Sequence, residues 1–546
     1  MDGTQPPTTP TGERPHGSPP RGLAGTPASP ISSGRFGRMF RHLPVYSPKI
    51  SSLEDLGRKM IQELEDGELD KPLGIEDDDE NTAELDNGEL RLPAGYTYFG
   101  QFVDHDITFD PVSSLTRQND PDGLEDFRTP RFDLDSLYGR GPADQPYLYE
   151  KDGVHLQPGE KVSTGNERVE GPDLQRNANE RALVGDPRND ENLIVSQLQA
   201  TFLKFHNGVL DQVAERNSHL EKDDIFKLAQ KEVRWHYQWV VVHDFLARLV
   251  GQEVVDDILR PEPYATPTGA EAATPVPRLR FYRWNEQPYM PVEFSVAAYR
   301  FGHSMIRPSY KINDVAETSP AIDGVSRIPI FPIGENDGPR QSLKGFRKLE
   351  SDWGVQWRFF LDGIEDGLGD DPNLPQPGYK LDAQLSNPLG TLPKSTAGPE
   401  DIGTSSPTDA QDLAIRNLIR GKMLGLPSGQ DVARAMGIEP LGDDELFNGV
   451  EIGEPAREDL ADRAPLWFYV LKEAEVRAGS AHLGPVGGRI VAEVLIGLLA
   501  GDPLSYLGVQ PNWKPTLKED GGFTLSDLIN IAVPAPEAQV PPPYSP

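Results

Sequence analysis

The chain has 546 residues, of which 86 are acidic and 53 basic, and its formal net charge is -33. Long-range repulsion from this charge opposes encounters with nucleic-acid phosphates and anionic membranes, so neither is expected as a partner. The chain contains no cysteine, which excludes disulfides, thiolate metal sites and thiol nucleophiles, and which suits a protein that handles oxidants. Any metal chemistry must therefore use histidine, carboxylates or a cofactor.

The two ends of the chain differ in composition from its centre. Residues 1–44 are rich in Pro, Gly, Ser and Arg and have almost no large apolar side chain before Phe36, so we predict a disordered arm. Residues 535–546 form a proline-rich tail. We predict one domain over residues 45–534, with an acidic surface loop at 65–89. No stretch is apolar enough for a membrane span and no classical signal peptide is present, so we expect a cytoplasmic protein or export by a non-classical route.

Helical periodicity of apolar residues is the main local signal in the domain. Period-2 strand patterns are few and short, so the fold class is predicted to be mainly α with long loops. The predicted helices after the first hundred residues cover residues 193–213, 225–250, 291–305, 409–423, 466–478 and 487–499.

The segment 99–106 places two carboxylates and an amide around one histidine in otherwise aromatic and apolar sequence. In a helix, Gln101, Asp104 and His105 share one face, because they stand at i, i+3 and i+4. Asp106 then points elsewhere, so that one helix could serve two sites. The alternative is a helix start with solvated acids and a hydrogen-bonded core histidine.

An oxygen-rich loop follows this segment. Thr129, Asp133 and Asp135 carry side-chain oxygens, and the backbone carbonyl of Arg131 lies between them in sequence. Hard cations prefer such ligands. The spacing is not that of an EF-hand, so the loop alone indicates either a calcium site or a turn rich in Asp.

A third constellation, residues 185–191, lies where a loop enters the first long helix. Asn189 or Asp190 could cap that helix. Arg188 and Glu191 are three residues apart and could form a local ion pair, which would be weak at a surface. Alternatively, the guanidinium is held on a rigid loop and stabilises negative charge that develops during a reaction.

Two further polar groups lie within the predicted helices 291–305 and 409–423. Gly302 leaves space beside His303, which a flat cofactor approaching a helix would need. Asn417 is an amide among aliphatic residues, and a buried amide needs a partner. One candidate partner is the second ring nitrogen of a metal-bound histidine. For His303 alone, the alternative is a hydrogen-bonded core histidine.

The order of these motifs resembles that of the animal-type haem peroxidases, within the peroxidase-cyclooxygenase superfamily, and a bacterial branch is expected. The likeness spans about residues 90–500. It implies a mainly α domain around a haem b that can become covalently attached, and an enzyme that reduces hydrogen peroxide and oxidises a halide, thiocyanate or small phenol through a ferryl haem. The motifs are Gln101-x-x-Asp104-His105-Asp106, Thr129-x-x-x-Asp133-x-Asp135, Arg188-x-x-Glu191, Arg300-x-Gly302-His303 and Asn417-x-x-Arg420.

The resemblance also implies roles for individual residues. His105 would be the distal histidine that moves the peroxide proton, Arg188 its charged companion and Gln101 the amide that places water or a halide. His303 would be the axial ligand of the iron, with Asn417 holding its second ring nitrogen.

Further residues would hold the cofactors. The carboxylates of Asp104 and Glu191 match those that form esters with haem methyl groups, and Arg300 and Arg420 belong to the haem-binding set. The calcium ligands would be Asp106, Thr129, the carbonyl of Arg131, Asp133 and Asp135.

Two departures limit what the resemblance carries over. Asn192 stands where some members have a methionine joined to the haem, so the strongest chloride oxidation is not expected. The nearest alternative is a haem-dependent fatty-acid dioxygenase of the same superfamily, which uses a tyrosine three residues before the axial histidine. That position is Arg300, and Tyr299 would be turned by about 100° in an α-helix. The other alternative is a haem-binding protein without activity, which would have no use for His105 or Arg188.

Overall fold

The computed structural model describes most of the predicted domain. Helices dominate the described part of the chain, and its strands are two-residue pairs, which confirms the mainly α fold class. Residues 1–33, the acidic loop at 65–89 and the tail at 535–546 lie outside the described residues. None of the helices in the described part is both long and apolar enough to cross a membrane. The described residues are 34–62, 91–109, 115, 119–124, 126, 128–162, 171–260, 275–316, 327–332, 340–367, 374–397, 402–519 and 521–534.

The α-helices are α1 Ile50–Lys59, α3 Ala94–Ile107, α4 Asp135–Tyr138, α5 Leu193–Arg216, α6 Lys222–Val240, α7 Ala247–Val250, α8 Gln252–Ile258, α9 Val292–Ser295, α10 Lys394–Ala397, α11 Leu413–Met423, α12 Gly429–Met436, α13 Asp443–Leu446, α14 Glu454–Leu460, α15 Leu466–Ala478, α16 Pro485–Gly501, α17 Tyr506–Val509 and α18 Leu525–Ala532. The 3-10 helices are η1 Pro121–Gly123, η2 Pro146–Leu148, η3 Pro187–Asp190, η5 Ala298–His303, η6 Trp357–Phe359, η7 Asn387–Gly390 and η8 Asp409–Gln411, and η4 Val241–Leu246 is π-helical. The strand pairs are β1 Phe36–Gly37 with β4 Met290–Pro291 (parallel), β2 Lys161–Val162 with β3 Gly171–Pro172 and β5 Ser309–Tyr310 with β6 Ile328–Pro329 (both antiparallel).

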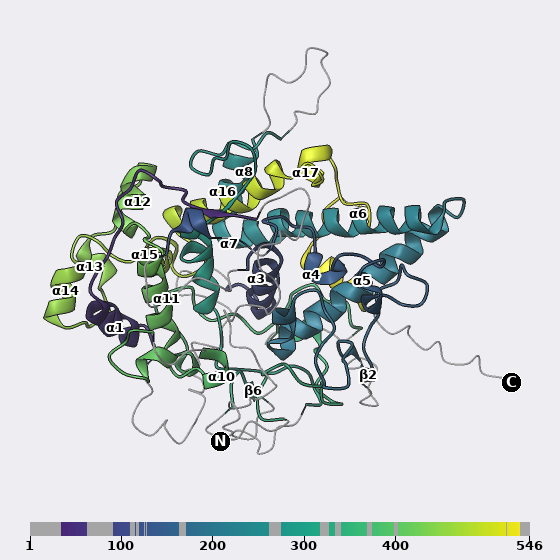
Figure 1. Cartoon of the computed structure of the whole chain (residues 1–546), viewed down its shortest axis with the longest axis horizontal. Coiled ribbons are helices and arrows are strands. Elements are labelled where there is room, and N and C mark those ends of the chain that lie inside the picture. Colours follow the sequence, from purple (N-terminus) through teal and green to yellow (C-terminus); the bar gives the residue numbers. More distant parts are fainter. Residues whose placement is uncertain are drawn as a thin grey trace, which may run out of the picture.

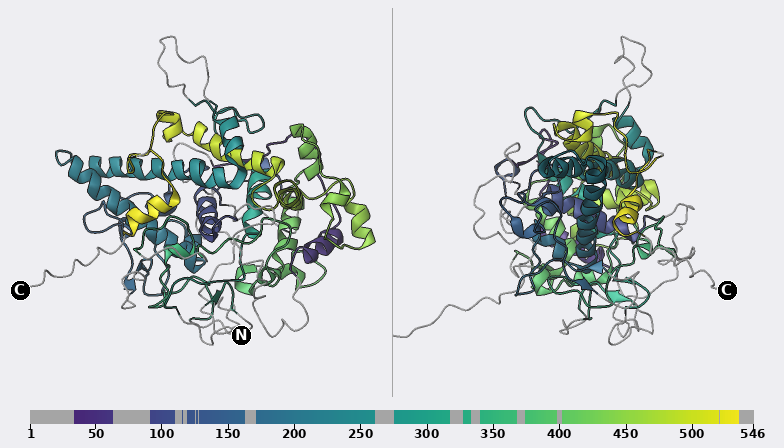
Figure 2. Two further views of the ribbon diagram at one scale, coloured as in Figure 1. Left: turned by 180° about the vertical axis from the view of Figure 1, so that it is seen from behind. Right: turned by 90° about the vertical axis from the view of Figure 1, so that its right-hand side faces the viewer.

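Helix α3 lies near the centre of the molecule, below the long helix that α6, η4 and α7 form together (Figure 1). Helix α5 packs along α6 and also contacts α3. Helices α11 to α15, with α1 packed against α11 and α14, make up the other side, and the view from behind gives the same arrangement (Figure 2). The central helix α3 therefore has packed helices around it.

The long helices agree with the predicted ranges. Helix α15 covers the predicted residues, α16 includes its predicted range, and α6 to α7 are continuous over the predicted second helix. The cap of α5 differs from the prediction. Its N-cap is Asn192, whose Oδ1 accepts from the backbone of Val195 at 2.9 Å, whereas Asn189 and Asp190 lie in η3. Asn189 is thereby left for another role.

Two predicted helices are broken. Residues 291–305 form β4, α9 and η5, because Ala297 leaves the helical region with φ -127° and ψ -77°. Residues 409–423 form η8 and then α11, because Asp412 starts a new helix by accepting a hydrogen bond from Ile415 N at 3.0 Å. His303 therefore lies at the end of a 3-10 helix, which was not predicted.

The predicted arm extends too far into the domain. Residues 34–44 pack on the body, because β1 pairs with β4 and the buried carboxylate of Glu293 accepts from Met39 N and Phe40 N, both at 2.9 Å. Phe36, Met39 and Phe40 are buried. The apolar residues near the end of the predicted arm thus anchor residues 34–44 to the domain.

Candidate active site

One face of α3 is open while the rest of the helix is buried. Within residues 94–107, Gln101 and Asp104 are the partly exposed positions. They are three residues apart and share a face, as the spacing predicts. Asp106 has no exposed surface and points into a different cluster, and His105 is 1% exposed. An open polar face on a buried helix is suited to a ligand.

A chain of amides fixes the tautomer of His105. The carbonyl of Ser136 can only accept, so Nε2 of Gln199 faces it at 3.3 Å and Oε1 of Gln199 accepts from Asn189 Nδ2 at 2.8 Å. Oδ1 of Asn189 must then face His105, whose Nδ1 donates to it at 2.7 Å. The lone pair of the neutral ring is therefore on Nε2, which lies 3.5 Å from Oε1 of Glu191.

Arg188 is held beside His105 by an ion pair that was not predicted. Its Nη2 donates to the carbonyls of His105 at 3.0 Å and Thr108 at 2.6 Å, and also to Asp186 Oδ2 at 2.8 Å. Burial alone would raise the pKa of Asp186, but Arg128 and Arg188 lower it far below its ordinary value. The charged carboxylate of Asp186 thus fixes the guanidinium, which agrees with the alternative of an arginine held on a rigid loop.

Glu191 instead faces α3. Its Oε1 accepts a hydrogen bond from Gln101 Nε2, and Oε1 of Gln101 accepts from Asn192 Nδ2 at 3.0 Å. The Asp104 carboxylate lies 3.9 Å from Arg188 Nη1. The structure therefore brings together all five residues that the sequence predicts on the distal side.

A second histidine, His303, lies at the end of η5 and is partly exposed. Asn417 Nδ2 donates to its Nδ1 at 2.8 Å, and Arg300 Nη1 donates to Asn417 Oδ1 at 2.6 Å. A Cβ added to Gly302 would meet no atom within 4 Å, so space is open beside the ring. Asn417 and His303 are neighbours, as predicted, but the amide donates to the ring nitrogen and does not accept from it. To accept from His303 Nδ1–H, the amide group must rotate by 180° and give up its hydrogen bond with Arg300.

Tyr299 joins the two groups of residues. Its hydroxyl donates to the carbonyl of Gly100 on α3 at 3.1 Å, directly before Gln101 in the chain. Its ring stacks on Phe294 with 4.6 Å between the centroids. Because η5 is a 3-10 helix with three residues per turn, Tyr299 is turned from Arg300 by about 120° and not by the predicted 100°. The elements that carry His105 and His303 are thus in direct contact.

The oxygen-rich loop meets the far face of α3. Carboxylate oxygens of Asp106, Asp133 and Asp135 lie within 4.8 Å of one another. Oδ1 of Asp106 and Oδ1 of Asp135 are buried without a hydrogen-bond partner among the described residues. Burial raises the pKa of Asp106 well above its ordinary value, and the other two carboxylates add to the rise.

The remaining predicted ligands of this cluster are also nearby in the loop. Thr129 Oγ1 donates to Asp133 Oδ2 at 3.0 Å, and the side chain of Arg131 is directed to Asp502, at 2.5 Å. Asp135 has one oxygen 3.0 Å from Arg128 Nη1. The cluster of acids is therefore only partly neutralised by protein groups.

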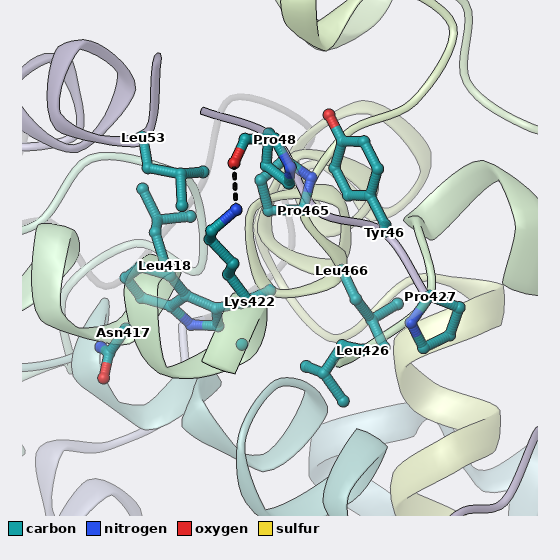
Figure 3. Close-up of a pocket in the computed structure, with 12 residues that line it drawn as sticks. Tyr46, Pro48, Leu53, Asn417, Leu418, Lys422, Leu426, Pro427, Pro465 and Leu466 are labelled. Atoms are coloured by element: carbon teal, nitrogen blue, oxygen red, sulfur yellow. Dashed lines mark hydrogen bonds between the residues drawn. The ribbon is translucent and has the colours of Figure 1, made fainter. Parts of the chain in front are cut away.

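A small cavity lies on the side of α11 that packs against the segment before α1. It is lined by Asn417, Lys422, Trp467 and Tyr46, among others, and Lys422 Nζ donates to the carbonyl of Pro48 at 2.6 Å (Figure 3). Its volume of about 20 Å³ is enough for a single water molecule, so it does not compete as a cofactor site.

The structure thus defines a candidate cofactor site with a histidine–arginine pair on α3 and η3 and a histidine–amide pair on η5 and α11. Residues 124–329 match the model of the animal haem peroxidase family. This stretch contains Arg188, Glu191 and His303, whereas α3 and Asn417 lie outside it. Over these residues the chain is similar to the animal haem peroxidases, a family named for the haem that its members bind.

Curated proteins with similar sequences include other peroxidases. Peroxidasin of Drosophila melanogaster is 24% identical over 351 residues, covering 62% of this chain and 19% of the relative. Human thyroid peroxidase is 26% identical over 126 residues, which are 23% of this chain and 12% of the relative. The chain therefore spans less than a quarter of the length of these relatives.

Two solved structures share the fold. Peroxidase A from Dictyostelium discoideum has a TM-score of 0.55 and 13% identity, with 92% of this chain and 96% of that chain covered. The fatty acid alpha-dioxygenase of Arabidopsis thaliana has a TM-score of 0.53 and 14% identity, with 93% and 76% covered. At such low sequence identity, the likeness shows a shared fold and does not show a shared reaction.

Sequence reasoning missed two residues that position the distal side chains. Asn189 sets the tautomer of His105, and Asp186 fixes Arg188. A signal for Asp186 was present, because an acid before a proline is a usual start for a helical turn, and its side chain does accept from Arg188 N at 2.8 Å. Asn189 was considered only as a helix cap.

Proposed function

We propose that this protein is a haem peroxidase that reduces hydrogen peroxide and oxidises a halide, thiocyanate or a small phenol. One observation carries the proposal: the amide chain through Asn189 leaves the lone pair of His105 on Nε2, beside an arginine that is charged and fixed. A base for the peroxide proton and a cation for the departing oxygen are the two groups that cleavage of the O–O bond needs. The match of residues 124–329 to the animal haem peroxidase family supports the same reaction.

The residues present fit a haem. With the amide of Asn417 turned, Nδ1–H of His303 would donate to it, and the lone pair on Nε2 would then be directed to the iron. The open side of Gly302 gives a planar group access to the ring. Arg300 donates to Asn417, and Arg420 follows Asn417 by three residues in α11. Both guanidinium groups would hold the haem carboxylates. Bound haem would supply the redox centre that reacts with peroxide.

The protein groups then act in a fixed order. Nε2 of His105 accepts the proton of the oxygen that attacks, and the same nitrogen returns it to the oxygen that leaves. Arg188 stabilises the negative charge on the leaving oxygen and transfers no proton, because a guanidinium stays charged. Gln101 and Glu191 bound the space in front of Nε2, where they would orient a water molecule or a halide.

Haem reconstitution followed by mixing with peroxide tests the proposal. We expect a Soret band, a spectral change that depends on the peroxide concentration, and turnover with bromide, iodide, thiocyanate or a phenol. Haem binding without a peroxide reaction would instead favour an inactive haem-binding protein. Oxygen uptake with a fatty acid, in the absence of halide turnover, would favour the dioxygenase alternative and contradict the proposal.

Asn189 gives a test of the tautomer argument. Asn189→Leu removes the acceptor of His105 Nδ1–H, so the proton is no longer held on that nitrogen and less of the ring has its lone pair on Nε2. We expect the rate of the peroxide reaction to fall about tenfold or more, because an acid–base group contributes about 100- to 10,000-fold when correctly placed. Asn189→Asp keeps an acceptor and should restore most of the rate. Equal rates in both variants would contradict the role of Asn189.

We propose further that the oxygen-rich loop binds calcium through Asp106, Thr129, the carbonyl of Arg131, Asp133 and Asp135. The unpartnered buried oxygens of Asp106 and Asp135 support this, because a buried charge needs a partner. A cation there would tie α3 to the loop and thus hold His105 in place.

Calcium removal should lower the melting temperature of the wild type. At a free concentration of 100 times Kd, a bound ion stabilises the folded state by about 2.7 kcal/mol. Asp106→Asn should lose the response to calcium and, without calcium, should be at least as stable as the wild type, because it removes one of three closely spaced carboxyl groups. Asp152→Asn, on the surface, is the matched control. A calcium-dependent melting temperature in Asp106→Asn would contradict the assignment.

A further inference from the structure

A cluster of oxidisable rings lies outside the proposed haem site. Trp235 and Trp239 of α6 meet Trp513 with 5.5 and 6.1 Å between ring centroids, and these three residues are called the tryptophan cluster. Tyr506, the first residue of α17, lies 5.9 Å from Trp239 and 5.8 Å from Trp513. In a chain without cysteine, Trp and Tyr are the side chains that lose one electron most easily. Four of them are thus in contact at one place.

Tyr506 has a base in contact with its hydroxyl. Nε2 of His243 lies 3.0 Å from the hydroxyl oxygen, and the imidazole stacks on Trp239 with 3.8 Å between centroids. Burial and the nearby Lys514 lower the pKa of His243 to about 4, so the ring is neutral near pH 7 and able to accept a proton. Burial raises the pKa of Tyr506 above its ordinary value, so the phenol keeps its proton unless it is oxidised.

His243 lies in η4, the π-helical turn between α6 and α7. A π-helical turn inserts an extra residue into a helix and occurs frequently at functional sites. The next residue, Asp244, is directed elsewhere and accepts from Tyr96 OH at 2.9 Å. The turn therefore directs two adjacent polar side chains to different partners, one of which is Tyr506.

The helix that carries the tryptophan cluster also contacts α3. Tyr237 of α6 packs on Phe99 and Phe102 of α3, with 6.1 and 6.2 Å between centroids. Trp239 follows two residues later, about 3 Å farther along the helix axis. In Figure 1, α3 lies below the α6–α7 helix and α17 lies above it. Aromatic rings therefore extend from the helix of His105 to the outer side of α6.

The rings of the cluster are buried, but exposed aliphatic side chains lie beside it in the chain. Leu504, two residues before α17, and Val509, its last residue, are 54% and 55% exposed. Lys231 and Lys514 lie over the Trp235 and Trp239 rings, each at 4.7 Å from the centroid. A large apolar molecule could thus rest on exposed aliphatic groups within a short distance of Tyr506.

We propose that Tyr506, with His243 as its proton acceptor and the tryptophan cluster around it, is a second oxidation site for phenolic donors too bulky to enter the haem site. This inference rests on the proposed peroxidase function, because the peroxide-oxidised haem is the electron acceptor. One electron leaves Tyr506 toward the haem, and the phenolic proton moves to Nε2 of His243. The donor phenol then gives one electron to the Tyr506 radical, the proton on His243 returns to the Tyr506 oxygen, and the proton of the donor goes to solvent.

The first experiment compares donors of different size on the haem-loaded full chain. The probes are iodide and a phenol coupled to dextran. In Tyr506→Phe and in His243→Gln, we expect the ratio of dextran-phenol to iodide turnover to fall about tenfold or more, since both lack one half of the proton-coupled pair. Tyr138→Phe is the matched control, because the Tyr138 hydroxyl also contacts a histidine, His206 Nδ1, at 3.0 Å but lies elsewhere in the core. An unchanged ratio in Tyr506→Phe would overturn the proposal.

The second experiment needs no haem. A ruthenium tris-bipyridine photo-oxidant with persulfate is flashed with the haem-free protein, and tyrosyl radicals are recorded by electron paramagnetic resonance. We expect a signal that is lost in Tyr506→Phe, weakened in His243→Gln and kept in Tyr138→Phe. A signal that persists in Tyr506→Phe would overturn the proposal. A Tyr506 signal in a protein that does not react with peroxide would support the redox role of Tyr506 and overturn the peroxidase proposal alone.

Discussion

The His105→Ala variant should bind haem as the wild type does but react with peroxide about 100- to 10,000-fold more slowly, which is the contribution of a well-placed acid–base group. The reason is local. Nε2 of His105, which lies 3.5 Å from Glu191, is the proposed base, whereas the proposed ligand of the haem iron is His303. Stopped-flow spectroscopy in the Soret region measures the rate, and the Soret absorbance per protein measures haem content.

The matched control is His155→Ala. His155 is a half-exposed histidine held by Asp152 and Asp211, far from α3 in its contacts. Its replacement removes an imidazole without touching the site, so the peroxide reaction should keep its rate. If His105→Ala also kept the wild-type rate, His105 would have no part in the chemistry, and the proposed function would lose the observation on which it rests.

The sequence was sufficient wherever the signal is local. Helical spacing fixes which side chains share a face, so the open face of α3 with Gln101 and Asp104, and the opposite direction of Asp106, could be predicted. Long apolar periodicity likewise predicted α5, α15 and α16. Both depend on residues within a few turns of one another.

Contacts between distant segments were not predicted in the same way. His105 and Asn189 are 84 positions apart, and nothing in the residues around Asn189 distinguishes an imidazole partner from a helix cap. The extended start of the predicted helix 291–305 follows from the pairing of β4 with β1, whose residues are more than 250 positions away in the chain. The same pairing explains why the predicted arm ends earlier than expected. Tertiary contacts override local preference in these places.

The reversed amide of Asn417 has a comparable cause. The sequence places an amide near a histidine, but the orientation of the amide depends on Arg300, which competes for Asn417 Oδ1 at 2.6 Å. Because Arg300 also belongs to the predicted haem-binding set, one residue has two possible partners. Haem carboxylates that attract Arg300 would free the amide to turn toward the role predicted for it.

Covalent attachment of haem should depend on two carboxylates, Asp104 and Glu191. Their side chains are 31% and 17% exposed on the open distal face, where His105 is 1% exposed, so they are the acids that a bound haem would meet. We therefore expect haem to resist acid–acetone extraction after peroxide treatment, because peroxide supplies the two-electron oxidation that a bond between a carboxylate oxygen and a methyl carbon requires.

The isosteric variants Asp104→Asn and Glu191→Gln separate the two links. Each should lose one ester, seen as a mass change of the haem-bearing peptide, and the double variant should release nearly all of its haem. Wild-type protein kept from peroxide is the control and should also release it. The two links differ in their surroundings, since Glu191 accepts from Gln101 whereas Asp104 accepts from Thr108 Oγ1 at 2.9 Å. The Asp104 carboxylate is the more exposed of the two, so its ester should form first. Complete extraction of haem from the peroxide-treated wild type would show that neither ester forms.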